Sequence, residues 1–378
     1  MKRGVLGYLG LVMLGTATPA AAQSMGFGGQ YQNYVFDQPN LAGVESISLF
    51  AIPVAASVSV GSRVSVSVSA AYAEATATGP DGLDSKLAGF SDTDLGVSLR
   101  VGPRWLLVSA GTTLPTGQAT LTTREIYVAS FFAADLLPFA INTWGTGGSV
   151  GGDVAVATQA GAWGIGFSAG YRLAQEYEPI PEFDFQYKPG NALQLRVALD
   201  RNVSTSGTLS ILLGLQSFGD DEVEGANLFR SGTRIQGVVT YAFALGMRSS
   251  ALVYGGMNHR SSGTTQLLEA VLPGVSDSPA QQLFMGGTNF RLAFGRGHAI
   301  LSRAELLVYR AEDGRSQGWV GTLGPSFDWR ITGTSASRQL VLVPSAYLRT
   351  GNVIVEDGLE TGFLGWEAGL TLRWVPGR

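Results

Sequence analysis

The sequence contains no cysteine among its 378 residues. This absence excludes a disulfide scaffold, a thiolate metal site and a lipid-modified N-terminal cysteine. Charged residues are also scarce: they make up 14% of the chain, whereas soluble domains carry about 25%. The net charge of −4 provides no basic surface for a nucleic acid, so we expect no nucleic-acid partner.

After the first residues, no stretch is apolar for long enough to form a membrane-spanning helix. The best candidate, ASFFAADLLPFAI at residues 129–141, is short and contains Asp135 and Pro138, whereas a spanning helix needs about 20 apolar residues. A membrane protein with this sequence would therefore be a closed β-barrel, because that is the other structure that satisfies its backbone hydrogen bonds in lipid.

The N-terminus has the parts of a secretory signal peptide. Lys2 and Arg3 precede an apolar stretch at residues 5–14, which leads into the small-residue sequence PAAAQ. A membrane anchor is the weaker interpretation, since the apolar stretch is shorter than the roughly 20 residues that a span needs. We therefore expect a signal peptide at residues 1–22 and a single mature domain at residues 23–378.

Strand-like segments recur through the mature chain. The clearest is VSVSVSAAY at residues 64–72, where valine and serine alternate. Alternation with a period of two puts one set of side chains on each face of a strand. The same pattern continues at residues 94–101, 163–172, 193–200 and 363–374. The pattern predicts an all-β fold in which most strands have one apolar face and one polar face.

Short and long connections alternate between these segments. Tight turns rich in glycine and serine are predicted near residues 61–63, 102–104, 160–162, 202–207, 246–248, 295–297 and 333–338. Longer polar segments lie at residues 77–90, 115–146, 176–190, 219–231, 261–282, 311–316 and 351–360. Tight turns at one end and long loops at the other are typical of a transmembrane antiparallel β-barrel of the outer membrane, with the turns in the periplasm.

The predicted number of strands depends on the N-terminal segment. From residue 46 onward the pattern gives fifteen strands, and a closed bacterial barrel of one chain has an even number. A first strand within GFGGQYQNYVF, residues 26–36, gives sixteen, which we favour; the alternative makes this segment a plug and gives fourteen. We expect residues 115–146 to be a long extracellular loop, with a short helix around residues 125–137 that folds over or into the barrel mouth.

The charged residues indicate which face of the strands meets lipid, because they share the face opposite the apolar side chains. One arginine near the bilayer midplane costs about 2–4 kcal/mol, and several would exceed the usual stability of a domain, about 5–15 kcal/mol. The charged face must therefore line an aqueous lumen. A soluble sandwich or propeller is the rival fold, but its outer faces would carry more lysine and glutamate. The charged positions are Arg100, Arg172, Arg196, Asp200, Arg234, Arg291, Arg303, Glu305, Asp328, Arg330, Glu367 and Arg373.

Some of these charged residues are candidates for a constriction of the lumen. Mixed arginine and glutamate can line a polar channel, or they can stiffen the wall through ion pairs. Both interpretations fit the sequence. The candidates expected nearest to the middle of the barrel are Arg196, Arg291, Arg303, Glu305 and Glu367.

The sequence offers little for catalysis or metal binding. Neither His259 nor His298 has a second ligand at metal-binding spacing, so we predict no metal, no cofactor and no catalytic residue. MNHRSSG at residues 257–263 places His259 near Ser261 and Ser262, and it resembles faintly the His-and-Ser stretch of outer-membrane phospholipases. A serine nucleophile needs a hydrogen-bonded base and a third group that orients it, and neighbours in sequence do not show that. A solvated strand end is the favoured interpretation.

Two neighbouring segments resemble one outer-membrane family. SDTDLGVSLRV at residues 91–101 and LLVSAGTTLPTG at residues 106–117 are similar to a Gly-Asp-x-x-Leu strand that leads, one hairpin later, to Leu-Pro-Thr-Gly. Residues 52–72 resemble the paired strands of the same family. It comprises the outer-membrane transporters of phenol- and aromatic-degradation pathways, which are related to long-chain fatty-acid channels. The resemblance implies passive uptake of small, mostly hydrophobic compounds.

The sequence thus favours an outer-membrane channel for small hydrophobic or aromatic solutes. A structural or adhesive barrel with a closed lumen is the alternative, and a lipid-modifying enzyme that uses His259 is the third hypothesis. The expected partners are the solute, outer-membrane lipid and lipopolysaccharide. Acidic stretches at residues 176–184 and 220–224 could hold divalent cations together with lipopolysaccharide phosphates, although solvated loops are the favoured interpretation.

Overall fold

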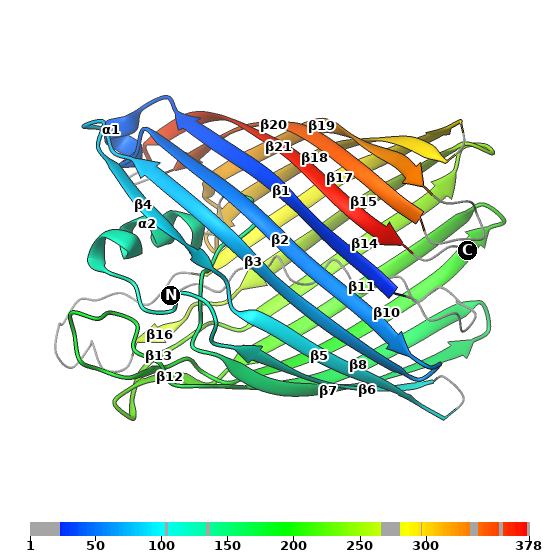
Figure 1. Cartoon of the computed structure of the whole chain (residues 1–378), viewed down its shortest axis with the longest axis horizontal. Helices are drawn as coiled ribbons and strands as arrows, with labels where there is room; N and C mark the ends of the chain where they lie inside the picture. The colour runs from blue at the N-terminus through cyan, green and yellow to red at the C-terminus, as the bar shows by residue number, and fades with distance from the viewer. Residues whose placement is uncertain are drawn as a thin grey trace.

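The computed structural model describes residues 23–102, 105–133, 137–265, 280–295, 297–332, 339–354 and 358–375. The predicted signal peptide at residues 1–22 lies outside the described residues, as do most of the predicted loop 261–282 and the predicted turn 333–338. Most of the described chain is antiparallel β-strand (Figure 1). No described helix is long and apolar enough to cross a membrane.

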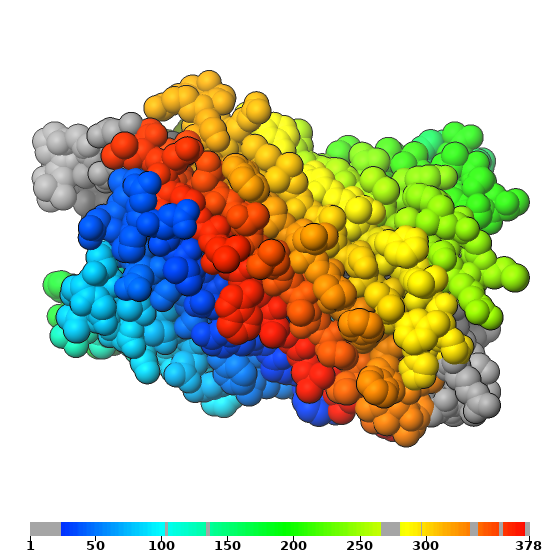
Figure 2. Space-filling model, turned by 90° about the horizontal axis from the view of Figure 1, so that it is seen from above, coloured from blue at the N-terminus to red at the C-terminus, as the bar shows by residue number. Residues whose placement is uncertain are grey.

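The strands close into one barrel. Strand β1 (Gln23–Phe36) pairs with β2 (Ser46–Val60) along one edge and with β21 (Glu360–Val375) along the other. Figure 2 shows the result on the outer surface, where β1 in blue lies beside β21 in red. The remaining wall strands are β3 (Val64–Thr78), β4 (Asp84–Phe90), β5 (Thr93–Val101), β6 (Leu106–Leu114), β7 (Ser149–Ala160), β8 (Trp163–Ala174), β10 (Ala192–Ser204), β11 (Gly207–Phe218), β14 (Arg234–Ala244), β15 (Ser249–Arg260), β17 (Gln281–Phe294), β18 (His298–Ala311), β19 (Ser316–Thr332) and β20 (Gln339–Ile354).

Two of these strands share one position in the wall. Strand β4 pairs with the second half of β3, and β5 pairs with its first half. The wall therefore has 16 strand positions, and the prediction of sixteen strands is confirmed. The alternative of fourteen strands with an N-terminal plug is wrong, because residues 23–36 form backbone ladders with both β2 and β21. This strand closes the barrel, and closure is required because an unpaired strand edge is not stable in lipid.

Turns and loops separate to opposite ends of the barrel, as predicted. Strand β1 starts and β21 finishes at the end with the tight turns, which makes that end periplasmic. At the extracellular end, on the left in Figure 1, three loops join in a second sheet of β9 (Tyr187–Lys188), β12 (Asp220–Val223), β13 (Ala226–Arg230) and β16 (Thr264–Thr265). The predicted loop 77–90 is wrong in extent, because β4 continues the wall and leaves a connection of residues 79–83.

The outer surface of the barrel is apolar. Val66 and Val68 point outward with 41% and 39% of their surface exposed, and Ser67 between them faces the lumen. Valine, leucine, phenylalanine and tryptophan continue this exposed surface around the wall. In a soluble sandwich or propeller this apolar surface would be in contact with water, at a free-energy cost of about 25 cal/mol per Å². The apolar face of the wall therefore meets lipid.

An apolar core lies inside the lumen, in its extracellular half. The inward side chains of β2 and β3 there are apolar and fully buried: Ile47, Leu49, Ala73, Ala75 and Ala77 are each at most 1% exposed. The expectation of a polar inner face is therefore wrong for this part of the wall. These residues pack against the long loop between β6 and β7, so the wall is apolar on both faces where a loop replaces luminal water.

Two adjacent residues of β5 test the direction of the wall. Val97 faces outward and is 48% exposed, while Ser98 faces the lumen. We expect Val97→Arg to lower the free energy of unfolding by about 2–4 kcal/mol, because it places a charge in lipid. Ser98→Arg should change it by less than about 1 kcal/mol, as at a solvated site. Urea unfolding in lipid vesicles, followed by tryptophan fluorescence, measures both, and equal losses would contradict the assignment of faces.

Candidate functional site

The loop between β6 and β7 folds into the barrel mouth. We call residues 115–148 the plug loop, of which 115–133 and 137–148 are described. It carries helix α2 (Thr123–Ala133), in the part of the loop where a short helix is expected around residues 125–137. Figure 1 shows α2 at the extracellular end of the barrel, beside β4.

A capping box starts α2. The backbone N–H of Thr122 donates to the Glu125 carboxylate at 2.8 Å, and the backbone N–H of Glu125 donates to the Thr122 hydroxyl at 3.4 Å. Gln118 donates a further hydrogen bond to the same carboxylate at 2.7 Å. Burial raises the pKa of Glu125, but these hydrogen bonds outweigh burial and hold the pKa below its usual value. The helix therefore begins with an ionised, fully hydrogen-bonded carboxylate.

Aromatic side chains fix the plug loop to the wall. The ring of Phe132 lies 4.2 Å from that of Phe139 and 5.4 Å from that of Trp144, and Phe139 also packs against Tyr34 of β1 at 5.1 Å. Trp144 is 2% exposed, and its indole N–H donates to the backbone carbonyl of Ala73 at 3.2 Å. Each such side chain contributes about 1.5–3 kcal/mol by burial. A buried aromatic cluster therefore fixes the plug loop to the inner face of the wall.

Asp92 ties the two ends of the plug loop together. It lies at the break between β4 and β5, where one carboxylate oxygen accepts from the Gly117 N–H at 3.1 Å. The other accepts from the backbone N–H and the hydroxyl of Thr146, at 2.7 and 3.1 Å. Nearby, the N–H of Gln118 donates to the carbonyl of Phe90 at 3.2 Å, so the loop also covers an edge of β4. The break in the wall is thus the anchor of the loop.

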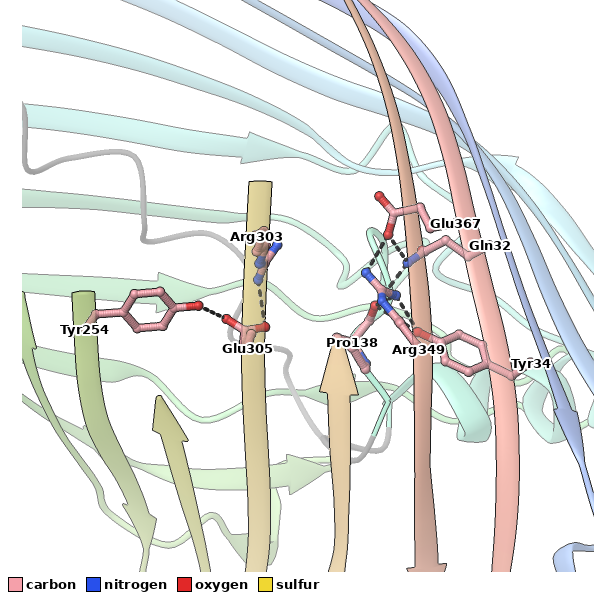
Figure 3. Close-up of polar contacts among 8 residues, drawn as sticks. All are labelled: Gln32, Tyr34, Pro138, Tyr254, Arg303, Glu305, Arg349 and Glu367. Atoms are coloured by element: carbon pink, nitrogen blue, oxygen red, sulfur yellow. Dashed lines mark hydrogen bonds and ion pairs between the residues drawn. The ribbon is translucent and has the colours of Figure 1, made fainter. Parts of the chain in front are cut away.

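Four side chains from three neighbouring strands hold the middle of the plug loop, and we call them the clamp: Gln32, Tyr34, Arg349 and Glu367 (Figure 3). The Gln32 side chain donates to the Pro138 carbonyl at 3.0 Å and accepts from the Ala140 N–H at 2.8 Å. Arg349 donates to the same Pro138 carbonyl at 2.7 Å. The clamp therefore binds backbone groups that the loop, inside the lumen, would otherwise leave unsatisfied.

The clamp contains a buried ion pair. Arg349 donates to the Glu367 carboxylate and to the Tyr34 hydroxyl, and Gln32 donates to Glu367 at 3.1 Å. The two charged side chains are only 7% and 12% exposed. Removal of one partner from a buried pair costs about 3–5 kcal/mol, because the other charge is left uncompensated. The plug loop and the ion pair therefore stabilise each other.

A second polar group lies farther along the same wall, and we call it the Tyr254 cluster: Tyr254, Arg303 and Glu305 (Figure 3). Arg303 donates to Glu305 at 2.7 Å, and the Tyr254 hydroxyl donates to the other carboxylate oxygen. Gly287 separates Tyr254 from Glu305 in the sheet, and a β-carbon there would lie 2.6 Å from the tyrosine oxygen. The glycine is what allows Tyr254 to reach across a whole strand.

The clamp and the Tyr254 cluster lie at one level of the wall. The backbone ladders pair Glu305 with Thr322 and Thr322 with Arg349, so one threonine separates the two groups. We call the two groups and Thr322 the polar belt. Leu307 and Val320, on the extracellular side of this level, belong to the apolar core of the plug. The belt is therefore the polar floor of the plugged half of the lumen.

The wall on the other side of the lumen is lined differently. From β7 to β11 most of its inward positions are small or polar, with Gly166, Ser168 and Gly170 on β8 as an example. Arg196 donates to Gln194 at 2.8 Å, and the charged Asp153 and Arg172 remain exposed. Small side chains leave room in the lumen, and exposed charges require water. This half of the lumen is therefore hydrated.

The five predicted constriction residues fall at different places in the barrel. Arg303 and Glu305 contact each other in the Tyr254 cluster, and Glu367 belongs to the clamp. Arg196 lies on the opposite wall, and Arg291 is exposed to the lumen near the periplasmic end of β17. The structure thus places three of them in the polar belt and separates the other two from it.

The sequence prediction missed Gln32, Tyr34, Tyr254 and Arg349. A signal for Arg349 is present, because it is a charge at the centre of the apolar strand QLVLVPSAYLRTGNVI, on the face opposite Leu348. The backbone groups bound by Gln32 and Arg349 lie 106 and 211 residues away in the chain. No local pattern could have joined the clamp to the plug loop.

The histidine sites give no support to catalysis. His259 lies on the outward face of β15, and the Ser261 hydroxyl donates to the Ser262 carbonyl at 3.4 Å. His298 accepts a backbone hydrogen bond from Arg330 at 3.2 Å. Among the described residues, no hydrogen bond joins His259 to a serine and no group of three potential metal ligands occurs. A base–nucleophile pair, which an esterase requires, is not formed here.

The acidic loops are partly neutralised by ion pairs. Residues 220–223 form β12, in which Asp220 contacts Arg230 at 2.7 Å and Glu222 contacts Lys188 at 3.2 Å. The hydrogen bond from Arg230 holds the pKa of Asp220 below its usual value. Within this sheet the carboxylates therefore join loops to each other.

No family model matches the chain, and no curated protein matches its sequence. Solved structures with a similar fold include an outer-membrane channel from Pseudomonas putida F1, with 13% identity, coverage of 78% of this chain and 97% of that one, and a TM-score of 0.40. A bacterial polysaccharide outer-membrane secretin has 11% identity, coverage of 93% and 98%, and a TM-score of 0.47. A Pseudomonas aeruginosa FadL homologue has 7% identity, coverage of 94% and 90%, and a TM-score of 0.43.

The class of the protein follows from its own structure. The sheet is closed, its outer face is apolar, and tight turns and long loops lie at opposite ends. A closed barrel with lipid outside and a partly hydrated lumen is the architecture of bacterial outer-membrane proteins. The protein is therefore an outer-membrane β-barrel with sixteen wall positions and a plug loop inside its extracellular half.

The ion pair of the clamp can be tested against a more exposed pair. We expect Glu367→Gln to lower the free energy of unfolding by about 3–5 kcal/mol, because it leaves the Arg349 charge buried. It should also speed the hydrogen exchange of the Ala140 amide, because Gln32 and Arg349 lose the partner that orients them. Urea unfolding in vesicles and hydrogen exchange measured by mass spectrometry check the two effects.

The matched control for Glu367 is Asp328 in the neighbouring part of the wall. Asp328 pairs with Arg373 at 2.5 Å near the periplasmic rim, with side chains 20% and 46% exposed. Asp328→Asn should cost less than about 1 kcal/mol, as for other exposed pairs. It should leave the exchange of Ala140 unchanged. Equal effects of the two substitutions would show that the clamp does not hold the plug loop.

Proposed function

We propose that the protein is a channel for passive diffusion of small hydrophobic or aromatic solutes into the cell, with the plug loop narrowing its extracellular half. The observation that carries this proposal is the asymmetry of the lumen. One side is filled by the plug loop, whereas the other presents small residues and exposed charges. Sixteen-stranded barrels are wide enough to keep an aqueous passage.

The passage runs between the plug loop and the wall of β7 to β11. A solute enters beside α2 and crosses the level of the polar belt, where Arg303 keeps 39% of its side chain exposed. It then leaves past Arg196 and Arg291 toward the periplasm. In this proposal Arg303 and Glu305 line the passage at the polar belt, and Arg196 and Arg291 line it closer to the periplasm. Glu367 acts indirectly, because the clamp fixes how far the plug loop reaches into the lumen.

The solute class rests on the resemblance of β2, β3, β5 and β6 to transporters of aromatic-degradation pathways. An aromatic surface on the plug loop supports it. Tyr127 and Phe131 of α2 pack edge to face at 5.0 Å, and Tyr127 is 39% exposed. Aromatic rings favour other aromatic rings in this geometry. Weak contacts of this kind suit passage, because a solute must be able to leave as well as enter.

Conductance tests the proposed channel. We expect the purified barrel to conduct ions in planar bilayers, and the double variant Asp92→Asn, Trp144→Ala to conduct more. The variant removes the tether at the ends of the plug loop and the largest side chain that fixes it to the wall. Asp328→Asn, at the periplasmic rim, should conduct like the wild type. A wild type and a double variant that both fail to conduct would favour the closed structural or adhesive barrel instead.

Solute preference tests the finer part of the proposal. Liposomes that contain the barrel should swell faster in benzoate than in an isotonic solution of glucose at neutral pH, after correction for empty liposomes. Equal swelling rates in the two solutions would be consistent with a channel but would contradict its preference for aromatic solutes.

Ion selectivity tests the role of Glu305. We expect Glu305→Gln to shift the reversal potential toward anions in a salt gradient, because it leaves the charge of the exposed Arg303 without its carboxylate. Glu222→Gln removes a carboxylate from an ion pair outside the barrel wall and should leave the selectivity unchanged. If the Glu305→Gln variant has the wild-type reversal potential, the Tyr254 cluster does not line the passage.

A further inference from the structure

Three hydrogen-bond donors form a row on the outer face of the barrel. The backbone ladders place His259 of β15 opposite Gln282 of β17, and Gln282 opposite Arg310 of β18. All three lie near the extracellular ends of their strands. Adjacent strands are about 4.8 Å apart, so the whole row spans about 10 Å. We call these residues the outer donor row.

The outer donor row faces away from the lumen. Phe284 and Leu306 on the same faces of β17 and β18 are exposed to lipid at 38% and 48%, whereas Leu283 packs against the apolar core inside the barrel. The Arg310 guanidinium lies over the ring of Phe284, 5.8 Å from its centroid, which confirms that both point outward. The three donors are therefore accessible from the membrane.

The height of the row coincides with the lipid headgroups. Two ladder positions closer to the periplasm, at the next outward level, the residues are apolar: Met257, Phe284, Val308 and Trp319. Trp319 is 38% exposed, and tryptophan on the outer face of a barrel marks the interface of the membrane. Arginine costs about 0–1 kcal/mol at that level, against about 2–4 kcal/mol at the midplane. The Arg310 guanidinium therefore lies at the level of the lipid headgroups, where the acyl chains end.

Arg310 has no carboxylate partner within the described part of the chain. The nearest acidic residues in sequence are Glu312 and Asp313, and Asp313 accepts from both the backbone and the side chain of Arg315, at 3.0 and 2.5 Å. An exposed guanidinium with a free fork is suited to a phosphate, which it binds through two parallel hydrogen bonds. Gln282 and His259 add donors beside it.

We propose that the outer donor row binds the phosphate of a phosphorylated glycolipid in the outer leaflet, as in the lipid A part of lipopolysaccharide. The phosphate lies against Arg310 and Gln282 with His259 beside them, and the acyl chains lie along Met257, Phe284 and Val308. A free phosphate ion would bind the hydrogen-bond donors but would make no contact with the apolar side chains below them. The site thus places the outer donor row next to an apolar surface, which matches a lipid that has both a phosphate group and acyl chains.

Binding of defined glycolipids tests the site. The folded barrel in detergent is titrated with phosphorylated lipid A, with its dephosphorylated form and with inorganic phosphate, and bound ligand is measured by native mass spectrometry. We expect Arg310→Gln to weaken binding of phosphorylated lipid A about tenfold, which is the loss of about 1.4 kcal/mol. The dephosphorylated form should bind the wild type no better than it binds the variant.

Arg201 provides the matched control at the other end of the barrel. It is also an arginine over an aromatic ring, 5.3 Å from the centroid of Trp163, near the periplasmic end of β10. Arg201→Gln should bind phosphorylated lipid A like the wild type. Equal loss in both variants, or no loss in Arg310→Gln, would overturn the proposal. Inorganic phosphate bound as tightly as lipid A would overturn it too, since the site would then recognise the ion alone. Heat-modifiable migration on gels confirms that each variant is folded.

Discussion

A membrane barrel must turn its apolar side chains outward, and this constraint leaves its wall without an interior core. The described wall meets lipid on one face and the lumen on the other, so apolar packing has to be built inside the lumen. Here the plug loop supplies Phe132, Phe139 and Trp144, and the inward faces of β2 and β3 supply alanines together with Ile47 and Leu49. The strands in this region are apolar on both faces for that reason.

The apolar filling makes the lumen unequal. On the plugged side, buried backbone groups need partners, and the clamp provides them with an amide, a phenol and a guanidinium. Arg349 is tolerated there because Glu367, Tyr34 and the Pro138 carbonyl all accept from it. On the other side glycine and serine leave space, and charged groups are solvated. The same sheet therefore holds a dry, packed region and a wet one at the same height.

Much of this architecture could be predicted from the sequence, because a wall in lipid imposes a strict period of two. Alternation at residues 64–72 predicts the correct faces, and a strand within residues 26–36 brings the predicted count to sixteen, as the structure shows. The plug loop and its helix were expected in outline. What could not be predicted is where the loop goes, since Gln32 and Arg349 meet it through contacts that span more than a hundred residues. The break between β4 and β5 was also hidden, because Phe90 to Thr93 continue an apparently ordinary pattern of strand and turn.

The height of the wall is uneven, and this has a mechanical consequence for the plug loop. Strand β3 continues for nine residues beyond Ser69, the last residue that it pairs with β5, whereas β6 ends at Leu114, level with the start of β5. Nine residues correspond to about 30 Å along a strand. The extracellular rim of the barrel is therefore lower at β6 than at β3. The plug loop leaves the wall at this lower level, already inside the barrel. The plug loop starts from this lowered part of the rim and reaches Gln32 and Arg349 through the Pro138 carbonyl. The height at which β6 ends therefore limits how deep in the lumen the loop can lie.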